Sequence, residues 1–256
     1  MRPAIVLPFH DPDGSASIYL QRILTDLAPL FDCAYLGISP TTERTQPRLI
    51  EQLRANGFVR LSFRSATADI GDQFLSTFQH AATTSAPNQI LHLCFPDRVA
   101  FTLHSEHRAA FIADIQAIDP AQTPLLFQRS AAAWHTHPKN YFETERMATQ
   151  VGELLYGRSL DWAWCHLAIQ AGQLDKILPH INLHGLEMLA QIVFLLKDRL
   201  KIKYVDWLAW EDPYILNRDA AELRRERENS LVEHRKRLAY VIPTIQFLFD
   251  AEANDV

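Results

Sequence analysis

The first half of the chain alternates short apolar runs with segments whose apolar residues recur every three or four positions. The apolar runs predict five strands, at residues 4–9, 33–38, 58–63, 89–95 and 125–128. The helical spacing predicts a helix after the first strand, where Tyr19, Ile23 and Leu27 share a face, and others at 46–55, 70–82 and 105–118. Strands and helices that alternate in this way predict an α/β fold, with a mostly parallel sheet covered on both faces.

The second half of the chain is expected to be mostly helical. The same spacing predicts one further strand at 202–207, and helices at 141–156, 184–201 and 219–250, the last broken near Pro243. No linker rich in Gly, Ser or Pro interrupts the chain. We therefore expect a single domain, 1–256, with an α/β half at 1–128 and a mostly helical half at 129–256.

Parallel sheets of this kind bind ligands at the carboxyl ends of their strands. The segments that follow the predicted strands are therefore the first places to look for chemistry. We expect these segments to be loops, at 10–15, 39–45, 64–69 and 96–100.

Composition and charge narrow the function classes. The 256 residues are 48% hydrophobic and carry a formal net charge of −5, which excludes a disordered chain and implies no basic surface for nucleic acid. The apolar runs are too short for a signal peptide or a membrane span. Cys33, Cys94 and Cys165 lie among apolar neighbours and form no CxxC, so we expect reduced core thiols in a cytoplasmic protein.

The sequence contains no GxGxxG, no GxxxxGK[ST] and no GxSxG motif. A glycine-rich phosphate loop and a serine nucleophile elbow are therefore not indicated. Chemistry must be sought in other polar clusters.

Two polar motifs follow predicted strands. HDPDG, residues 10–14, can reach a ligand at the sheet edge, or can be an ordinary turn that caps the next helix. In FPDR, residues 95–98, Asp97 suits a divalent metal or a ribose and Arg98 suits a phosphate. The alternative for that motif is an Asp–Arg pair that caps a helix.

The second half holds a pair of histidines, HTHP at 135–138. On an extended segment His135 and His137 would face one side and could share a metal, although no third ligand has a recognisable spacing. A single contact from His137 is the simpler hypothesis. Glu143 and Glu145 begin the next predicted helix, where favourable interaction with the helix N-terminus is the alternative to a role in binding.

Two tryptophans lie beside carboxylates. Trp162 follows Asp161, and Trp210 precedes Glu211 and Asp212. An aromatic ring that stacks and a carboxylate that accepts hydroxyl hydrogen bonds together suit a sugar. The alternative is that each tryptophan belongs to the core.

The order of these motifs resembles a known family. Five segments, spread over roughly residues 4–215, are similar to segments of nucleotide-sugar glycosyltransferases of the GT-A fold. They are LPFHDPDG, CFPDR, THPKNYFETE, the DW segment and WEDP. The resemblance is nearest to a bacterial, family-2-like group. It implies transfer of a sugar from a nucleoside-diphosphate sugar to an acceptor hydroxyl.

The resemblance also implies roles at the donor site. Pro8, His10 and Asp11 would contact the base or ribose of the nucleotide. Asp97 would match the second aspartate of a DxD motif and, helped by His137, would hold a divalent cation, Mn²⁺ or Mg²⁺. Arg98 would help to neutralise the diphosphate.

Further roles follow for the acceptor side. Glu211 or Asp212, and less favourably Asp161, would act as the base on the acceptor hydroxyl. The residues expected to line the acceptor are Trp162, Trp210 and Glu143.

One position departs from the family pattern. Phe95 stands where the first aspartate of DxD is expected, and a lone carboxylate holds Mg²⁺ or Mn²⁺ weakly without other ligands. Two other functions therefore stay open. One is a degenerate GT-A-like binding or scaffold protein without catalysis, and the other is a metal-assisted hydrolase that uses His135 and His137.

Overall fold

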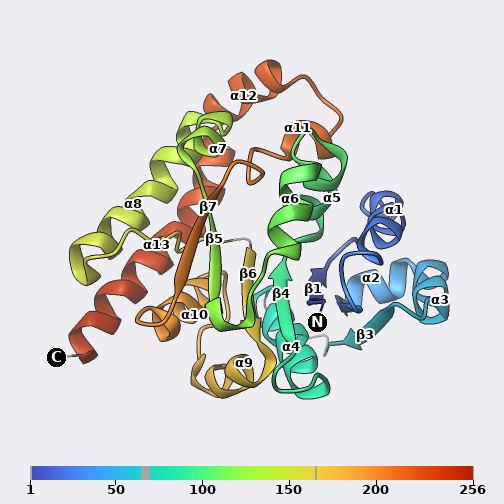
Figure 1. Cartoon of the computed structure of the whole chain (residues 1–256). Coiled ribbons are helices and arrows are strands. Elements are labelled where there is room, and N and C mark those ends of the chain that lie inside the picture. Colours follow the sequence, from blue (N-terminus) through green and yellow to red (C-terminus); the bar gives the residue numbers. More distant parts are fainter. Residues whose placement is uncertain (1, 65–69, 165, 256) are drawn as a thin grey trace.

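The structure, a computed structural model, describes residues 2–64, 70–164 and 166–255 (Figure 1). Within these residues, seven strands form one sheet in the order β3-β2-β1-β4-β6-β5-β7. The strands are β1 (Ala4–Phe9), β2 (Ala34–Ile38), β3 (Val59–Phe63), β4 (Ile90–Cys94), β5 (Leu125–Arg129), β6 (His166–Gln170) and β7 (Lys201–Val205).

The sheet is mostly parallel, as the sequence predicts. Only β6 runs against its neighbours, since it pairs antiparallel with both β4 and β5. The strands β4, β5 and β7 therefore point the same way, and their carboxyl ends meet at one edge. Strands from both halves of the chain pair within this one sheet.

Helices cover the sheet on both faces. The first half contributes α1 (Ser17–Leu27), α2 (Pro40–Thr45), α3 (Pro47–Ala55), α4 (Ile70–Thr84), α5 (Pro96–His104) and α6 (Arg108–Gln116). The second half contributes α7 (Ala131–Thr136), α8 (Lys139–Tyr156), α9 (Ala171–Ile177), α10 (Met188–Leu196), α11 (Asp212–Ile215), α12 (Ala220–Glu228) and α13 (Leu231–Asp255).

Two hydrophobic clusters divide these helices between the faces. One cluster joins the sheet to α1, α3, α5 and α6, and the other joins it to α4, α9 and α10. The long helices α8 and α13 lie side by side in the second half (Figure 1). Each face thus buries its own apolar layer, which leaves the strand ends as the place for polar chemistry.

A proline separates two central strands at that edge. The ladder between β1 and β4 ends at Val6, whereas β1 stays paired with β2 as far as Phe9. Pro8 lies beyond the last β4 pair and has no N–H to donate to a ladder. The chain leaves β1 toward β2 on one side and returns to β4 on the other. This reversal is the kind of position at which open α/β sheets bind ligands.

Several predicted elements differ from the structure. The loops expected at 39–45 and 96–100 are wrong, because Pro40 and Pro96 each stand at the start of a helix, where a proline costs no hydrogen bond. The loop expected at 64–69 falls, beyond Arg64, outside the described residues. The helix expected at 184–201 is shorter, since α10 ends at Leu196 and β7 begins at Lys201.

The C-terminal helix also differs. It breaks between Glu228 and Leu231 rather than near Pro243, which lies inside α13. The short helices α7 and α11 were not predicted, and neither were β6 and α9. The last two, β6 and α9, are consecutive elements at 166–170 and 171–177, so neither is long enough to show a clear period.

Candidate functional site

Two pairs of predicted residues meet in one pocket. Asp97 and Arg98 stand in the first turn of α5, directly after β4, and Glu211 and Asp212 stand at the start of α11, beyond β7. All four line a pocket of about 280 Å³. They come together because β4 and β7 end at the same edge of the sheet.

Arg98 and Glu211 form an ion pair across this pocket, with side chains only 11% and 8% exposed. The Arg98 guanidinium also donates to the carbonyl oxygen of Ala209 at 3.4 Å. Burial raises the pKa of Glu211 to about 7, with help from the charges of Asp97 and Asp212, even though Arg98 acts in the opposite direction. A carboxyl with such a pKa exchanges its proton near neutral pH, as a general base must.

Asp97 is more exposed to solvent than Glu211. It is partly exposed, and its Oδ1 accepts a hydrogen bond from the backbone N–H of Arg98 at 2.9 Å. Burial raises the pKa of Asp97, while Arg98 opposes the shift. Tyr19 lies near both Asp97 and Asp11, whose charges add to the effect of burial in raising its pKa. The ends of β1 and β4 therefore face a common space.

The sequence did not indicate Arg129, a buried cation that also lines this pocket. This side chain ends β5, is 3% exposed, and pairs with Glu145 at 2.6 Å and with Asp161 at 2.8 Å. A second hydrogen bond to Asp161 at 2.9 Å makes that contact bidentate. Its guanidinium also lies 3.5 Å above the ring of Trp134. Asp161, proposed as a base, is thus held as the counterion of Arg129.

Glu145 is a second buried charge of the pocket. Its Oε1 accepts hydrogen bonds from Tyr240 at 2.5 Å and from Arg237 at 3.1 Å. Burial alone would raise the pKa of Glu145, but Arg129 and Arg237 outweigh burial and lower it to about 2. The available signal was the spacing of Tyr141, Glu145 and Ala148, which places Glu145 on the buried stripe of α8 rather than at its N-terminus.

The two histidines of HTHP do not share a face. The prediction that they lie on one extended segment is wrong, because His135 lies in the last turn of α7 and is exposed, whereas His137 caps that helix and is 5% exposed. His137 Nδ1 lies 3.0 Å from the Ala133 carbonyl oxygen, so this nitrogen carries the proton. Burial lowers the pKa of His137 well below its usual value, and its Nε2 has no hydrogen-bond partner.

The donor residues expected in β1 and in the segment after it differ in exposure and in hydrogen bonding. Pro8 is buried within the strand. His10 is exposed, and its Nδ1 lies 2.8 Å from the Ser39 hydroxyl. Asp11 is 1% exposed and accepts a hydrogen bond from the Ala16 N–H at 3.0 Å, close to the start of α1. Asp11 therefore holds the turn that precedes α1, although its hydrogen bond does not cap the helix, whose first residue is Ser17.

The acceptor-side residues also differ from one another in exposure. Trp162 is 1% exposed and packs in the core beside Tyr156, with ring centroids 6.0 Å apart. Trp210 is 5% exposed and donates its backbone N–H to the Thr136 hydroxyl at 2.7 Å. Glu143 is exposed on α8 near Lys139. Both tryptophans thus have the core positions that the sequence offered as the alternative.

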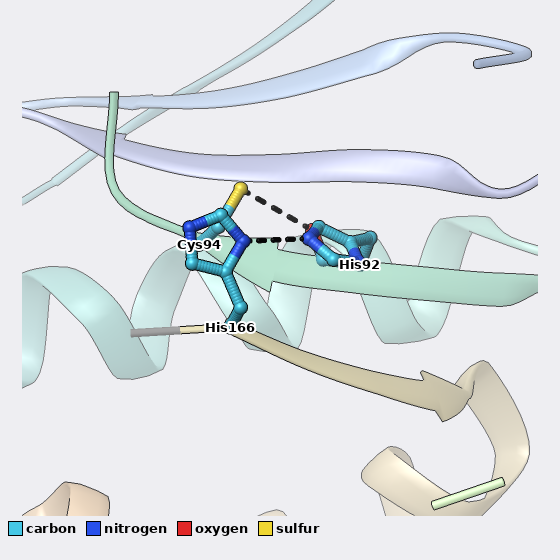
Figure 2. A group of neighbouring side chains, drawn as sticks. All are labelled: His92, Cys94 and His166. Atoms are coloured by element: carbon cyan, nitrogen blue, oxygen red, sulfur yellow. Dashed lines mark hydrogen bonds between the residues drawn. The ribbon is translucent and has the colours of Figure 1, made fainter. Parts of the chain in front are cut away.

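A separate cluster of chemical interest lies inside the sheet. His92 and Cys94 of β4 and His166 of β6 have ligand atoms within 4.8 Å of one another, an arrangement that could hold a metal ion (Figure 2). All three side chains are buried, and His92 Nε2 lies 2.9 Å from His166 Nδ1. Among the described residues, no other three His, Cys, Asp or Glu side chains form such a group. Asp97 and His137 are not part of it.

The comparisons with known proteins add no relative. No family model matches the chain, and no curated protein or solved structure matches it. Among the described residues, no helix is both long and apolar enough to cross a membrane.

Proposed function

We propose that the chain is a glycosyltransferase of the GT-A type that moves a sugar from a nucleoside-diphosphate sugar to an acceptor hydroxyl. The observation that carries this proposal is the meeting of Asp97 and Arg98 with Glu211 and Asp212 in one pocket. The two pairs come from segments more than 100 residues apart, and the pocket lies where α/β sheets bind ligands. The mostly parallel sheet is compatible with a GT-A domain.

The donor diphosphate would lie against Arg98 and the N-terminus of α5. A guanidinium pairs with phosphate, and the partial positive charge at a helix start also favours an anion. A phosphate that takes Arg98 would also remove the counterion of Glu211. That carboxylate would then be left as a stronger base for the acceptor hydroxyl.

A divalent cation would need ligands from the donor itself. Asp97 supplies one carboxylate. The neutral ring of His137, with an unpartnered Nε2, lines a different pocket from that of Asp97, and the described residues offer no three-ligand set that includes either of them. Phosphate oxygens would complete the coordination of Mn²⁺ or Mg²⁺. Such a cation would neutralise the diphosphate as the leaving group departs.

The first test of this proposal is thermal unfolding with UDP, GDP, CDP and ADP, each with and without Mn²⁺. Native-state binding raises the unfolding temperature by mass action. We expect a rise of several degrees with one nucleotide, larger with Mn²⁺. Asp97→Ala should abolish the Mn²⁺ effect, whereas Glu106→Ala, an exposed carboxylate beyond α5, should keep it.

A degenerate binding or scaffold protein is the second candidate, because the Arg98–Glu211 ion pair already satisfies both charges without a ligand. On that hypothesis no nucleotide raises the unfolding temperature in a metal-dependent way. The structure does not favour the hydrolase hypothesis, since His135 lies within α7 and His137 caps that helix, so the two rings do not share a face.

A further inference from the structure

The group His92, Cys94 and His166 is built by the pairing of two strands. His92 and Cys94 are two residues apart on β4, so both side chains leave the same face of the sheet. Cys94 is directly opposite His166 on the antiparallel strand β6. Figure 2 shows the three side chains converging from these two strands. Their positions are therefore fixed by the backbone of the sheet.

Aromatic rings enclose the group. The ring centroid of Trp207 lies 4.9 Å from that of His166, and the centroids of Phe111 and Phe127 lie 6.4 Å and 5.6 Å from that of His92. His92 and His166 are both 0% exposed. Within this enclosure the two imidazoles and Cys94 bring their ligand atoms to within 4.8 Å of one another.

The histidine pair leaves hydrogen-bonding atoms unmatched. Its one internal contact uses His92 Nε2 and His166 Nδ1, while His92 Nδ1 and His166 Nε2 have no partner. One ring must donate in that contact, so its far nitrogen is a bare lone pair among aromatic rings. Unpartnered buried polar atoms cost stability and in native proteins often mark an ion or a function.

We propose that His92, Cys94 and His166 form a binding site for one soft transition-metal ion, Zn²⁺ or Cu⁺. Imidazole and thiolate are the ligands that both ions favour. The near nitrogens, His92 Nε2 and His166 Nδ1, would bind the ion together with Cys94 Sγ. This site is distinct from the pocket of the proposed transferase and does not depend on that function.

The proton balance of binding is simple. Without metal, the Cys94 thiol donates to the His92 carbonyl oxygen, with a distance of 3.9 Å from Sγ to the oxygen. On binding, the thiol loses this proton and the thiolate bonds to the metal. The proton between the two rings moves to the far nitrogen of the ring that carried it. Both far nitrogens are then N–H groups, which can donate weakly to the surrounding rings. One proton leaves the protein for each ion bound.

The test uses the full chain, refolded under reducing and anaerobic conditions with Zn²⁺, with Cu⁺ or with Co²⁺ as a spectroscopic probe for the zinc site. We expect one ion per chain after dialysis. Co²⁺ should give a thiolate charge-transfer band. X-ray absorption of the Zn²⁺ form should show two nitrogen scatterers at about 2.0–2.1 Å and one sulfur at about 2.3 Å.

The variants assign the ligands. Cys94→Ser should lose the charge-transfer band and the bound ion, while Cys33→Ser, a half-buried thiol outside the group, should keep both. Asp97→Ala should also keep both, which separates this site from the transferase pocket. If the chain retains only Zn²⁺ or only Cu⁺ after dialysis, that result identifies the metal. Failure of wild-type chain to retain either ion, or absorption data without sulfur, would overturn the proposal even if Cys94→Ser did not fold.

Discussion

Arg98, in the first turn of α5, forms a buried ion pair with Glu211, which stands immediately before α11. The contact joins the segment after β4 to the segment after β7, at the edge where the strands of the sheet end. It also sets the electrostatics of the pocket. Glu211 keeps a raised pKa in spite of Arg98, since burial and the nearby Asp97 and Asp212 outweigh the guanidinium.

The raised pKa of Glu211 predicts a pH dependence of stability. Between its unfolded value of 4.5 and its folded value of about 7, the native chain holds a proton that the unfolded chain has released. The free energy of unfolding therefore falls as pH rises through this window, by up to about 3 kcal/mol. Glu211→Gln should remove this slope. Urea unfolding at about pH 5 and about pH 8 measures the slope, and an unchanged slope in the variant would contradict the prediction.

The same group makes a prediction for catalysis. If Glu211 is the base, kcat/KM for sugar transfer should rise through pH about 7 in the wild-type chain, because only the carboxylate accepts a proton and kcat/KM reports the pKa of the free chain. Glu211→Gln should lower kcat by about 10²–10⁴-fold. Glu106→Gln should leave the rate unchanged. Normal turnover in the Glu211 variant would assign the base elsewhere.

Glu145 should show the opposite dependence. Its folded pKa of about 2 lies below the unfolded value of 4.5, so its contribution is present above pH 4.5 and is lost as pH falls toward 2. Glu145→Gln should destabilise the chain by about 3 kcal/mol near neutral pH, with a gap that closes in acid. Denaturant unfolding across this range measures the gap. The exposed Glu153→Gln is the control, and an equal loss there would argue against a special role for Glu145.

Arg129 is expected to be the most sensitive charge of the pocket. Truncation to Met leaves Glu145 and Asp161 buried without their shared cation, which should cost about 3–5 kcal/mol. Arg129→Lys should recover only part of this, because an ammonium cannot make the bidentate contact or stack on Trp134. Urea unfolding followed by tryptophan fluorescence gives both values. Arg146→Met, on the exposed face of α8, is the control and should change little.

The sequence predicts the core of this fold better than its charge network. Strand runs such as 4–9 are visible because every residue is buried, and a continuous apolar run records that directly. The residues of the pocket that were predicted, such as Asp97 and Glu211, directly follow strands or close a distinctive motif. Arg129 was missed because it belongs to a strand, where its burial depends on partners 16 and 32 residues further along the chain.

The metal group was missed for a related reason. His92 and Cys94 are two residues apart on one strand, but the third residue, His166, is 74 positions from His92 and lies on a strand that was not predicted. Only the antiparallel pairing of β4 with β6 makes the three residues neighbours. Register of that kind is decided by packing over the whole sheet and leaves no local spacing to read.

The last prediction concerns the close packing of α4 against β2. A Cβ at Gly37 would lie 1.7 Å from the Thr77 hydroxyl oxygen, so Gly37→Ala must push α4 off the sheet. That shift would also strain Gln73, which donates to the Gly37 and Phe9 carbonyls at 3.1 Å and 2.8 Å. We expect a loss of about 1–3 kcal/mol in urea unfolding. Gly57→Ala meets nothing within 4 Å and should change stability by less than about 0.5 kcal/mol, so equal effects of the two substitutions would refute this close approach.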